Sequence, residues 1–317
     1  MKTKVFRLLF TSLAAISVST LHANPYELSP VSANAEASVL TFDQDALLSP
    51  SEVCDFAGPE TAASEPSASV KGSGEASGSA ADSVKSFGVE AGAGSFSAGG
   101  VDGKLYTIRI PYSKKLNERA TLLFTVPISL TNFDNNKLVG LKFKDTQAYG
   151  VGLNVGYAWQ AFLKRHNVPY RWKITPSTGI YYRDSNDLNN GSLVFNAGLS
   201  SSFAWQFQPG WVINLGNSVS MAWNNGISNY PDPVLDEQQT VSNGLQLIHM
   251  TGRWTYYTYY SHTDTLVDTL VDSYYTIAVG AGYQLTRKRS IKATLLSERG
   301  NGGYEALRGT LGTSWQF

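Results

Sequence analysis

The chain has 317 residues, of which 16% are charged and 12% aromatic, with 29 glycines and no long apolar run. This composition excludes helical membrane spans, which need about 20 consecutive apolar residues, and favours apolar residues that alternate with small or polar ones. The zero net charge is uneven: residues 24–100 hold eleven acidic residues and two lysines, whereas residues 101–317 hold twenty basic and fourteen acidic residues. Cys54 is the single cysteine, which excludes an intramolecular disulfide.

Residues 1–23 have the pattern of a secretory signal peptide. Three basic residues precede an apolar stretch that is diluted by Ser and Thr, and a small-residue cleavage pattern ends at Ala23. The stretch is too short for a membrane anchor, and no cysteine follows it directly, which argues against a lipoprotein. The sequence therefore predicts export through the secretory pathway to the periplasm, the medium or the outer membrane of a Gram-negative bacterium.

Residues 24–85 form an acidic segment rich in Ala, Ser and Gly and poor in aromatic residues. Such a segment cannot bury enough apolar surface to offset its ordering entropy, so it is predicted to be disordered or to order only against another part of the protein. Residues 37–53 contain enough apolar side chains for one short helix.

From residue 86 onward, apolar residues alternate with small or polar ones, which predicts β-strands. The clearest strand, residues 147–159, has Tyr149 and Leu153 on one face and Gly150 and Asn154 on the other. The pattern does not decide the facing of residues 245–251 and 254–260. The predicted strands are residues 87–98, 105–112, 120–131, 147–159, 171–183, 192–207, 211–223, 245–251, 254–260, 275–285, 291–295 and 307–317.

The connections alternate between two kinds. Short links at residues 113–118, 164–169, 208–210, 251–253 and 287–289 are interleaved with mostly longer polar links at residues 132–145, 184–191, 224–243, 261–273 and 299–303. Bacterial single-chain barrels have short periplasmic turns, longer external loops and an even number of strands. A periplasmic C-terminus then requires a strand before residues 105–112, and only residues 87–98 can supply it. We therefore predict an all-β, transmembrane, antiparallel meander β-barrel of twelve strands over residues 86–317; ten strands is the alternative, with the glycine-rich piece unpaired.

Aromatic residues lie where a membrane barrel needs them. Those beside the short links or the C-terminus are predicted to meet outer-membrane lipids at the headgroup level, namely Tyr112, Trp159, Trp172, Trp205, Trp211 and Trp315. The last strand has apolar residues at alternate positions up to Phe317. Trp315 and Phe317 thus resemble the closing strand that the barrel-assembly machinery of the outer membrane recognises.

The face opposite to the apolar one is predicted to line the lumen. Its clear acids are Glu90 and Glu298, and its basic residues are Arg109, Arg171, Lys173, Arg183, Lys292 and Arg308. A twelve-stranded barrel encloses a narrow interior that a short inserted segment can fill. We therefore hypothesise that part of residues 24–85, in particular residues 37–53, lies in or under the barrel and screens these cations. A solvated periplasmic tail is the alternative.

A signal peptide, a segment able to enter the lumen, about twelve meandering strands and a final aromatic residue resemble the translocator barrel of autotransporters. The resemblance covers residues 86–317 and implies a role in transport, secretion or envelope structure. An autotransporter normally carries a large passenger before its barrel, whereas this chain has a low-complexity segment there. The chain therefore resembles a solitary barrel of this type, and small porins or outer-membrane phospholipases of similar strand number also fit.

Enzyme signatures are sparse. An outer-membrane hydrolase of the phospholipase, lipid A deacylase or omptin-like kind would need polar residues grouped at the external rim. The candidates in the predicted external links are His262, Asp264, Asp184 and Asp187. No metal-ligand spacing, phosphate loop or nucleic-acid patch is present in the sequence, so no cofactor, metal or nucleic-acid partner is predicted.

Overall fold

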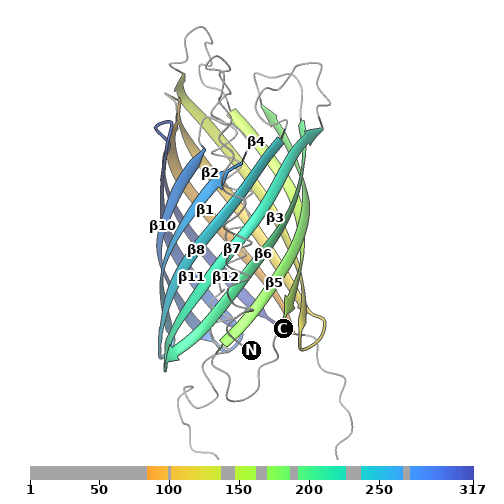
Figure 1. Ribbon diagram of the computed structural model, residues 1–317, viewed down its shortest axis with the longest axis vertical. Coiled ribbons are helices and arrows are strands. Elements are labelled where there is room, and N and C mark those ends of the chain that lie inside the picture. Colours follow the sequence, from red (N-terminus) through yellow and green to blue (C-terminus); the bar gives the residue numbers. More distant parts are fainter. Residues whose placement is uncertain are drawn as a thin grey trace, which may run out of the picture.

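The computed structural model describes residues 84–98, 101–136, 147–161, 170–185, 192–225, 237–266 and 272–317, whose regular structure consists of twelve strands in one closed barrel (Figure 1). Each strand pairs antiparallel with its neighbours in sequence, and the first pairs with the last. The strands are β1 (Lys85–Ala98), β2 (Val101–Lys115), β3 (Ala120–Asn136), β4 (Gln147–Gln160), β5 (Tyr170–Ser185), β6 (Ser192–Gln208), β7 (Trp211–Asn225), β8 (Glu237–Thr251), β9 (Trp254–Thr265), β10 (Ser273–Thr286), β11 (Arg289–Gly300) and β12 (Glu305–Gln316).

The glycine-rich strand β1 is the element that closes the barrel. It pairs with β12 continuously from Ser86 opposite Gln316 to Ser97 opposite Glu305, and it pairs with β2 on its other side. A closed sheet has no exposed strand edge, so all twelve strands can satisfy their backbone hydrogen bonds laterally. The all-β meander of twelve strands is confirmed, and the ten-strand alternative is wrong because β1 has partners on both sides.

Side chains alternate between an apolar outer face and a polar inner face. On β12 the outward Leu311 is 65% exposed, whereas the inward hydroxyl residues Thr131, Ser261 and Thr263 have 0% exposed surface. Polar side chains are thus more buried than leucines, which is the reverse of a water-soluble fold. The outer surface is the apolar one, as in barrels that cross a membrane with strands.

Three of the longer predicted links contain several residues that belong to strands. The predicted link 224–243 ends earlier because β8 begins at Glu237, β9 continues to Thr265, and β3 continues to Asn136. The physical reason is the polar lumen: Thr240 bonds Ser220 across the strands, and Ser242 bonds Thr263 at 2.6 Å. Strand segments whose inward positions are Ser and Thr resemble loop sequence when the neighbouring strands are not known.

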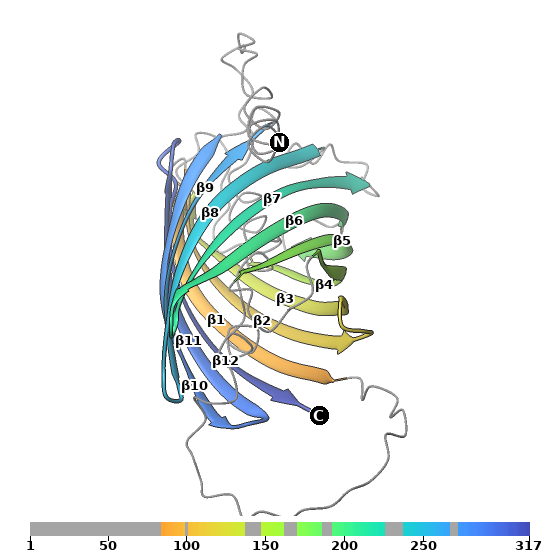
Figure 2. The same cartoon turned by 60° about the horizontal axis from the view of Figure 1, so that its bottom comes forward.

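The two ends of the barrel differ, and we name them the turn end and the loop end. The turn end holds the C-terminus and the tight turns after β6, β8 and β10, where Gly210 and Gly252 adopt positive φ values of 77° and 57° (Figure 2). Most links at the loop end lie outside the described residues, as do residues 1–83, with the predicted signal peptide and helix. Among the described residues, no helix is long and apolar enough to cross a membrane.

Candidate functional site

The lumen wall is built on glycines that let long side chains lie flat. Tyr181 of β5 lies against Gly150 and Gly152 of β4, where an added Cβ would overlap its ring, and its hydroxyl reaches Ser129 of β3 at 2.5 Å. In the same way Tyr257 of β9 lies over Gly280. These tyrosines cover the wall and link alternate strands.

A charged row follows the same rule at the seam between the first and last strands. Arg109, Glu90, Gly312 and Lys292 occupy one register line across β2, β1, β12 and β11. The ammonium of Lys292 crosses Gly312 and forms an ion pair with the carboxylate of Glu90. Glu90 is only 8% exposed, so its charge requires these cations. This cross-seam row joins four strands.

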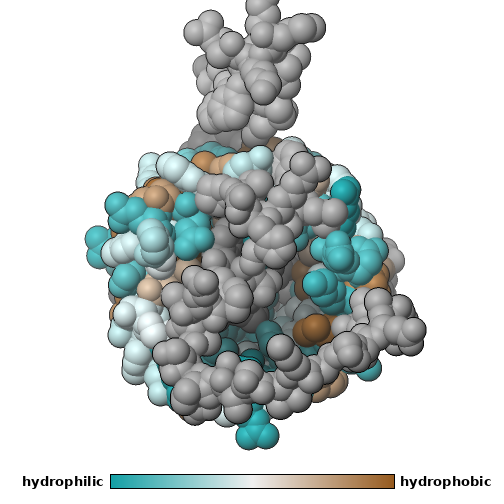
Figure 3. Space-filling view, turned by 90° about the horizontal axis from the view of Figure 1, so that it is seen from below, coloured by the Kyte–Doolittle hydropathy of each residue, from teal (hydrophilic) through white to brown (hydrophobic). Residues whose placement is uncertain are grey.

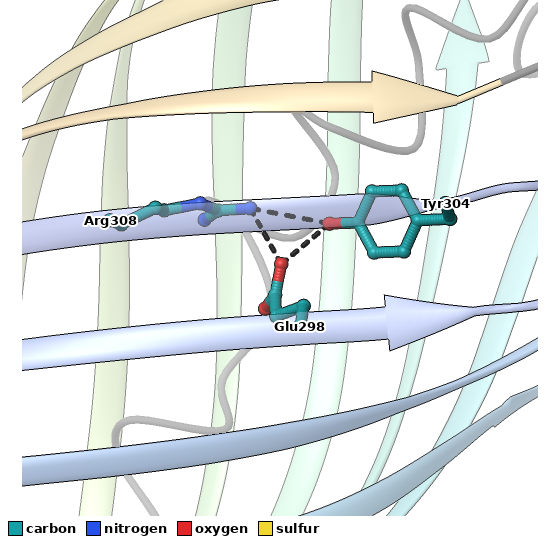
Figure 4. A network of polar contacts seen from close by, with 3 residues as sticks. All are labelled: Glu298, Tyr304 and Arg308. Atoms are coloured by element: carbon teal, nitrogen blue, oxygen red, sulfur yellow. Dashed lines mark hydrogen bonds and ion pairs between the residues drawn. The ribbon is translucent and has the colours of Figure 1, made fainter.

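A second buried network lies nearer the loop end of the same wall (Figure 4). The carboxylate of Glu298 on β11 accepts hydrogen bonds from the Tyr304 hydroxyl at 2.5 Å and from Arg308 on β12 at 2.9 Å. Arg308 also donates to the Tyr304 oxygen at 3.4 Å. Tyr304 has 1% exposed surface and packs edge-on against Tyr274. These hydrogen bonds connect β11, the link that follows it and β12.

The remaining lumen wall is mostly neutral in its described residues. On β6 to β8, Ser202 donates to Asn214 at 2.7 Å and Asn214 donates to Gln246 at 3.2 Å. Arg171 and Lys173 are the basic exception, on the inward face of β5 near the turn end. The side chain of Arg183, also predicted for the lumen, lies outside the described residues. The described wall therefore carries five of the predicted basic residues and both predicted acids.

The aromatic residues predicted for the membrane interface lie on the outer face beside the turn end. Trp211 stacks on His249 with ring centroids 4.2 Å apart, and Trp315 stacks on Phe87 at 5.9 Å. The other predicted members, Tyr112, Trp159, Trp172 and Trp205, occupy outward strand positions close to the same end.

Sequence reasoning missed one member of this group. Trp254 begins β9 on the outer face and packs against Tyr256 and Tyr283, with the Tyr283 centroid 4.7 Å away. Its position next to the turn at residues 252–253 was the available signal. That signal could not be used because the facing of residues 254–260 was undecided.

The hydrolase candidates do not converge in the described structure. His262, predicted for an external link, lies within β9, where its Nδ1 is 3.4 Å from the Asp264 carboxylate and its ring packs on Tyr275. Asp184 lies on β5, where it accepts hydrogen bonds from two tyrosine hydroxyls. Four strand spacings of about 4.8 Å separate β5 from β9, and both groups face outward. Asp187 lies outside the described residues.

In the described part of the chain, no cluster of three or more His, Cys, Asp or Glu side chains could hold a metal ion. The arrangement of the lumen offers binding chemistry instead. Its hydroxyl and amide groups can hydrogen-bond a polar occupant, and its cations favour an anionic one.

Comparison with solved structures identifies barrels of the same kind. The translocator domain of the autotransporter NalP from Neisseria meningitidis aligns with a TM-score of 0.50 and 12% identity, over 76% of this chain and 90% of that one. The chain resembles autotransporter translocators. The transport unit of AIDA-I from Escherichia coli gives 0.51 and 10% identity over 76% and 92%, and the β domain of Bordetella BrkA gives 0.53 and 10% over 73% and 98%.

The predicted resemblance is thereby confirmed at the level of the fold, since identities of 10–12% support nothing finer. No protein-family model and no curated protein sequence matches the chain. The translocator-like barrel must therefore be interpreted from its own residues.

Proposed function

We propose that this chain is an integral outer-membrane barrel of a Gram-negative bacterium, inserted after export through the secretory pathway, with a transport or secretion role. The observation that carries the proposal is the inverted distribution of side chains. Leucines such as Leu311 and Leu199 are more than half exposed on the outer face, while lumen hydroxyl groups are buried. Lipid is the solvent that matches such an outer face. The turn end then faces the periplasm.

The lumen's proposed occupant is the chain's own acidic N-terminal segment, residues 24–85. Charge supports this: apart from Lys71 and Lys85, its charged residues are acidic. The described lumen wall carries Arg109, Arg171, Lys173, Lys292 and Arg308 against two acids. The segment also joins the barrel at the turn end, through Lys85 of β1. An anionic strand of polypeptide and a basic lumen attract one another most strongly where water is restricted.

Two experiments test this proposal in order. Heat-modifiable migration on gels and recovery in the outer-membrane fraction test membrane insertion; a protein found only in the soluble periplasmic fraction would refute it. Single-channel conductance then compares the full chain with a variant that lacks residues 24–80. We expect the deletion to convert a low-conductance barrel into an open, anion-preferring pore, and an unchanged, already open pore would exclude the occupant.

A length-matched control separates charge from bulk. In this variant every Asp and Glu between residues 24 and 80 becomes Asn or Gln, so the segment keeps its length and loses its negative charge. If charge holds the segment in the lumen, this variant opens as often as the deletion does. If the neutral segment blocks conductance as well as the native one, the electrostatic argument is wrong while the occupant itself survives.

The C-terminal strand supports a proposed interaction with the barrel-assembly machinery. Trp315 faces outward at the seam and Phe317 is 61% exposed, so both rings are accessible on the outer surface. We expect Phe317→Ala to lower the amount of heat-modifiable protein in the outer membrane without changing the stability of the barrel refolded in detergent. Unchanged membrane assembly would refute this role.

The alternative function is an outer-membrane hydrolase, and one contact favours it: Nδ1 of His262 lies 3.4 Å from the Asp264 carboxylate. A histidine oriented by a carboxylate is part of a nucleophilic triad. The test is hydrolysis of phospholipid or peptide by the purified barrel, compared with His262→Ala.

A further inference from the structure

The rim of the turn end is strongly basic. Among the described residues, eight basic side chains lie there against one acid, Glu118, and most of them are exposed. Figure 3 shows hydrophilic side chains around the described parts of this end. They follow one continuous arc of strands, from the turn after β8, across the seam, to the turn after β2. The members of this basic arc are Lys85, Lys114, Lys115, Arg119, Arg253, Arg287, Lys288 and Arg289.

Backbone hydrogen bonds hold the basic arc in place. The Arg253 carbonyl accepts from Gln284 of β10 at 2.9 Å, and the Lys288 carbonyl accepts from Gln316 of β12 at 2.8 Å. Lys85 exchanges two such bonds with Phe317, at 3.0 and 2.9 Å. The turns that carry these cations are therefore extensions of the sheet, so the backbone positions from which the cations project are fixed before any ligand binds.

Aromatic rings lie directly above the basic arc on the outer face. Trp254 and Tyr283 contact one another beside Arg253, and Phe87 and Trp315 stack beside Lys85 and Arg289. Such rings prefer the headgroup level of a bilayer, where one edge is wet. The rings thus place the arc's cations at the depth of the lipid phosphates.

In its described residues, the loop end has the opposite charge. Outside the lumen, its described charged side chains are acidic at Asp102, Asp184, Asp264, Asp272 and Glu305, and basic only at Lys104 and Arg299. A barrel whose two rims differ in sign does not owe its basic arc to a generally basic surface. The two rims face chemically different surroundings.

We propose that the basic arc binds the phosphate groups of anionic phospholipids in the membrane leaflet at the turn end. The inference rests on the proposed membrane insertion and names the lipid class that the barrel selects. Cations at the headgroup level attract anionic lipids, and each contributes about fivefold to binding at moderate salt. Guanidinium groups such as Arg253 and Arg289 also suit phosphate oxygens because they can donate two parallel hydrogen bonds.

The test uses the full chain in nanodiscs that contain equal amounts of phosphatidylglycerol and phosphatidylcholine. Native mass spectrometry measures the ratio of the two lipids that remain bound on release. We compare the wild type with Arg253→Gln/Arg289→Gln and with a matched control at the other rim, Lys104→Gln/Arg299→Gln. Heat-modifiable migration of each variant shows beforehand that the barrel has formed.

We expect the wild type to retain phosphatidylglycerol in clear excess, and we expect that excess to fall about 25-fold in the Arg253→Gln/Arg289→Gln variant, because each of the two lost cations contributes about fivefold. The control variant should keep the wild-type ratio. Equal retention of both lipids by the wild type, or an equal loss in both double variants, overturns the inference. A barrel that never enters the nanodisc refutes the proposed function instead, so the two failures are distinguishable.

Discussion

Glu90 offers the sharpest test of how the barrel is closed. The residue is 8% exposed, its carboxylate forms an ion pair with Lys292 across Gly312, and it sits opposite Arg109 in the β1–β2 register. Glu90→Gln keeps the size and shape of the side chain and removes its charge. Lys292 and Arg109 would then face one another across the seam without the carboxylate that separates them.

The expected cost follows from the burial of the pair. Removing one partner of a fully buried ion pair costs about 3–5 kcal/mol, because it leaves an uncompensated charge. The Lys292 side chain is 35% exposed, so screening lowers the expected loss in the free energy of unfolding to about 1–3 kcal/mol. Replacing the second partner as well, in Glu90→Gln/Lys292→Met, should restore about half of that loss.

The assay is reversible urea unfolding in detergent micelles, followed by tryptophan fluorescence. Arg299→Gln is the matched control because Arg299 and Glu305 form an ion pair at 3.7 Å with side chains 77% and 65% exposed, and such a pair contributes less than about 0.5 kcal/mol. A Glu90→Gln barrel as stable as the Arg299→Gln barrel would refute the reasoning. So would a double variant that recovers nothing.

Three further outcomes are expected. Gly280→Val displaces the Tyr257 ring and should lower the free energy of unfolding by about 1–3 kcal/mol in the same urea assay; Gly309→Ala, where an added Cβ meets nothing within 4 Å, should change it little. Trp254→Ala loses two ring contacts and should cost about 1–3 kcal/mol by thermal unfolding, whereas a loss below 0.5 kcal/mol, roughly, would remove Trp254 from the stabilising girdle. His262→Ala should leave the rate of phospholipid hydrolysis at the wild-type background, and a large fall in that rate would favour the hydrolase instead.

Strand number and topology could be predicted because they depend on two patterns that are local in sequence. Alternation marks a strand that separates two solvents, and the alternation of short and longer links fixes the parity of the strands. Together they required the weak strand β1, although its Gly and Ala residues alone would not identify it. The structure confirms this strand as the one that pairs with both β2 and β12.

The facing of β8 and β9 could not be predicted, because these strands break the rule that apolar residues face outward. Tyr257, Tyr259 and Ile248 face the lumen, whereas His249 faces outward against Trp211. The inward tyrosines are accommodated because Gly280 and Gly244 lie beside them on neighbouring strands. Which glycine lies beside which ring depends on the register between strands, and a single sequence does not contain that register.

The same dependence on register bears on the width of the lumen. A tyrosine that points to the barrel axis would narrow the interior, yet Tyr181 and Tyr257 lie along the wall and bond Ser129 and Thr294 two strands away. The Lys292 side chain likewise extends along the wall to reach Glu90. Because these three long side chains follow the wall, they leave room in the interior for a polypeptide segment. The glycines opposite those side chains are therefore as much a condition for an occupant as the cations are.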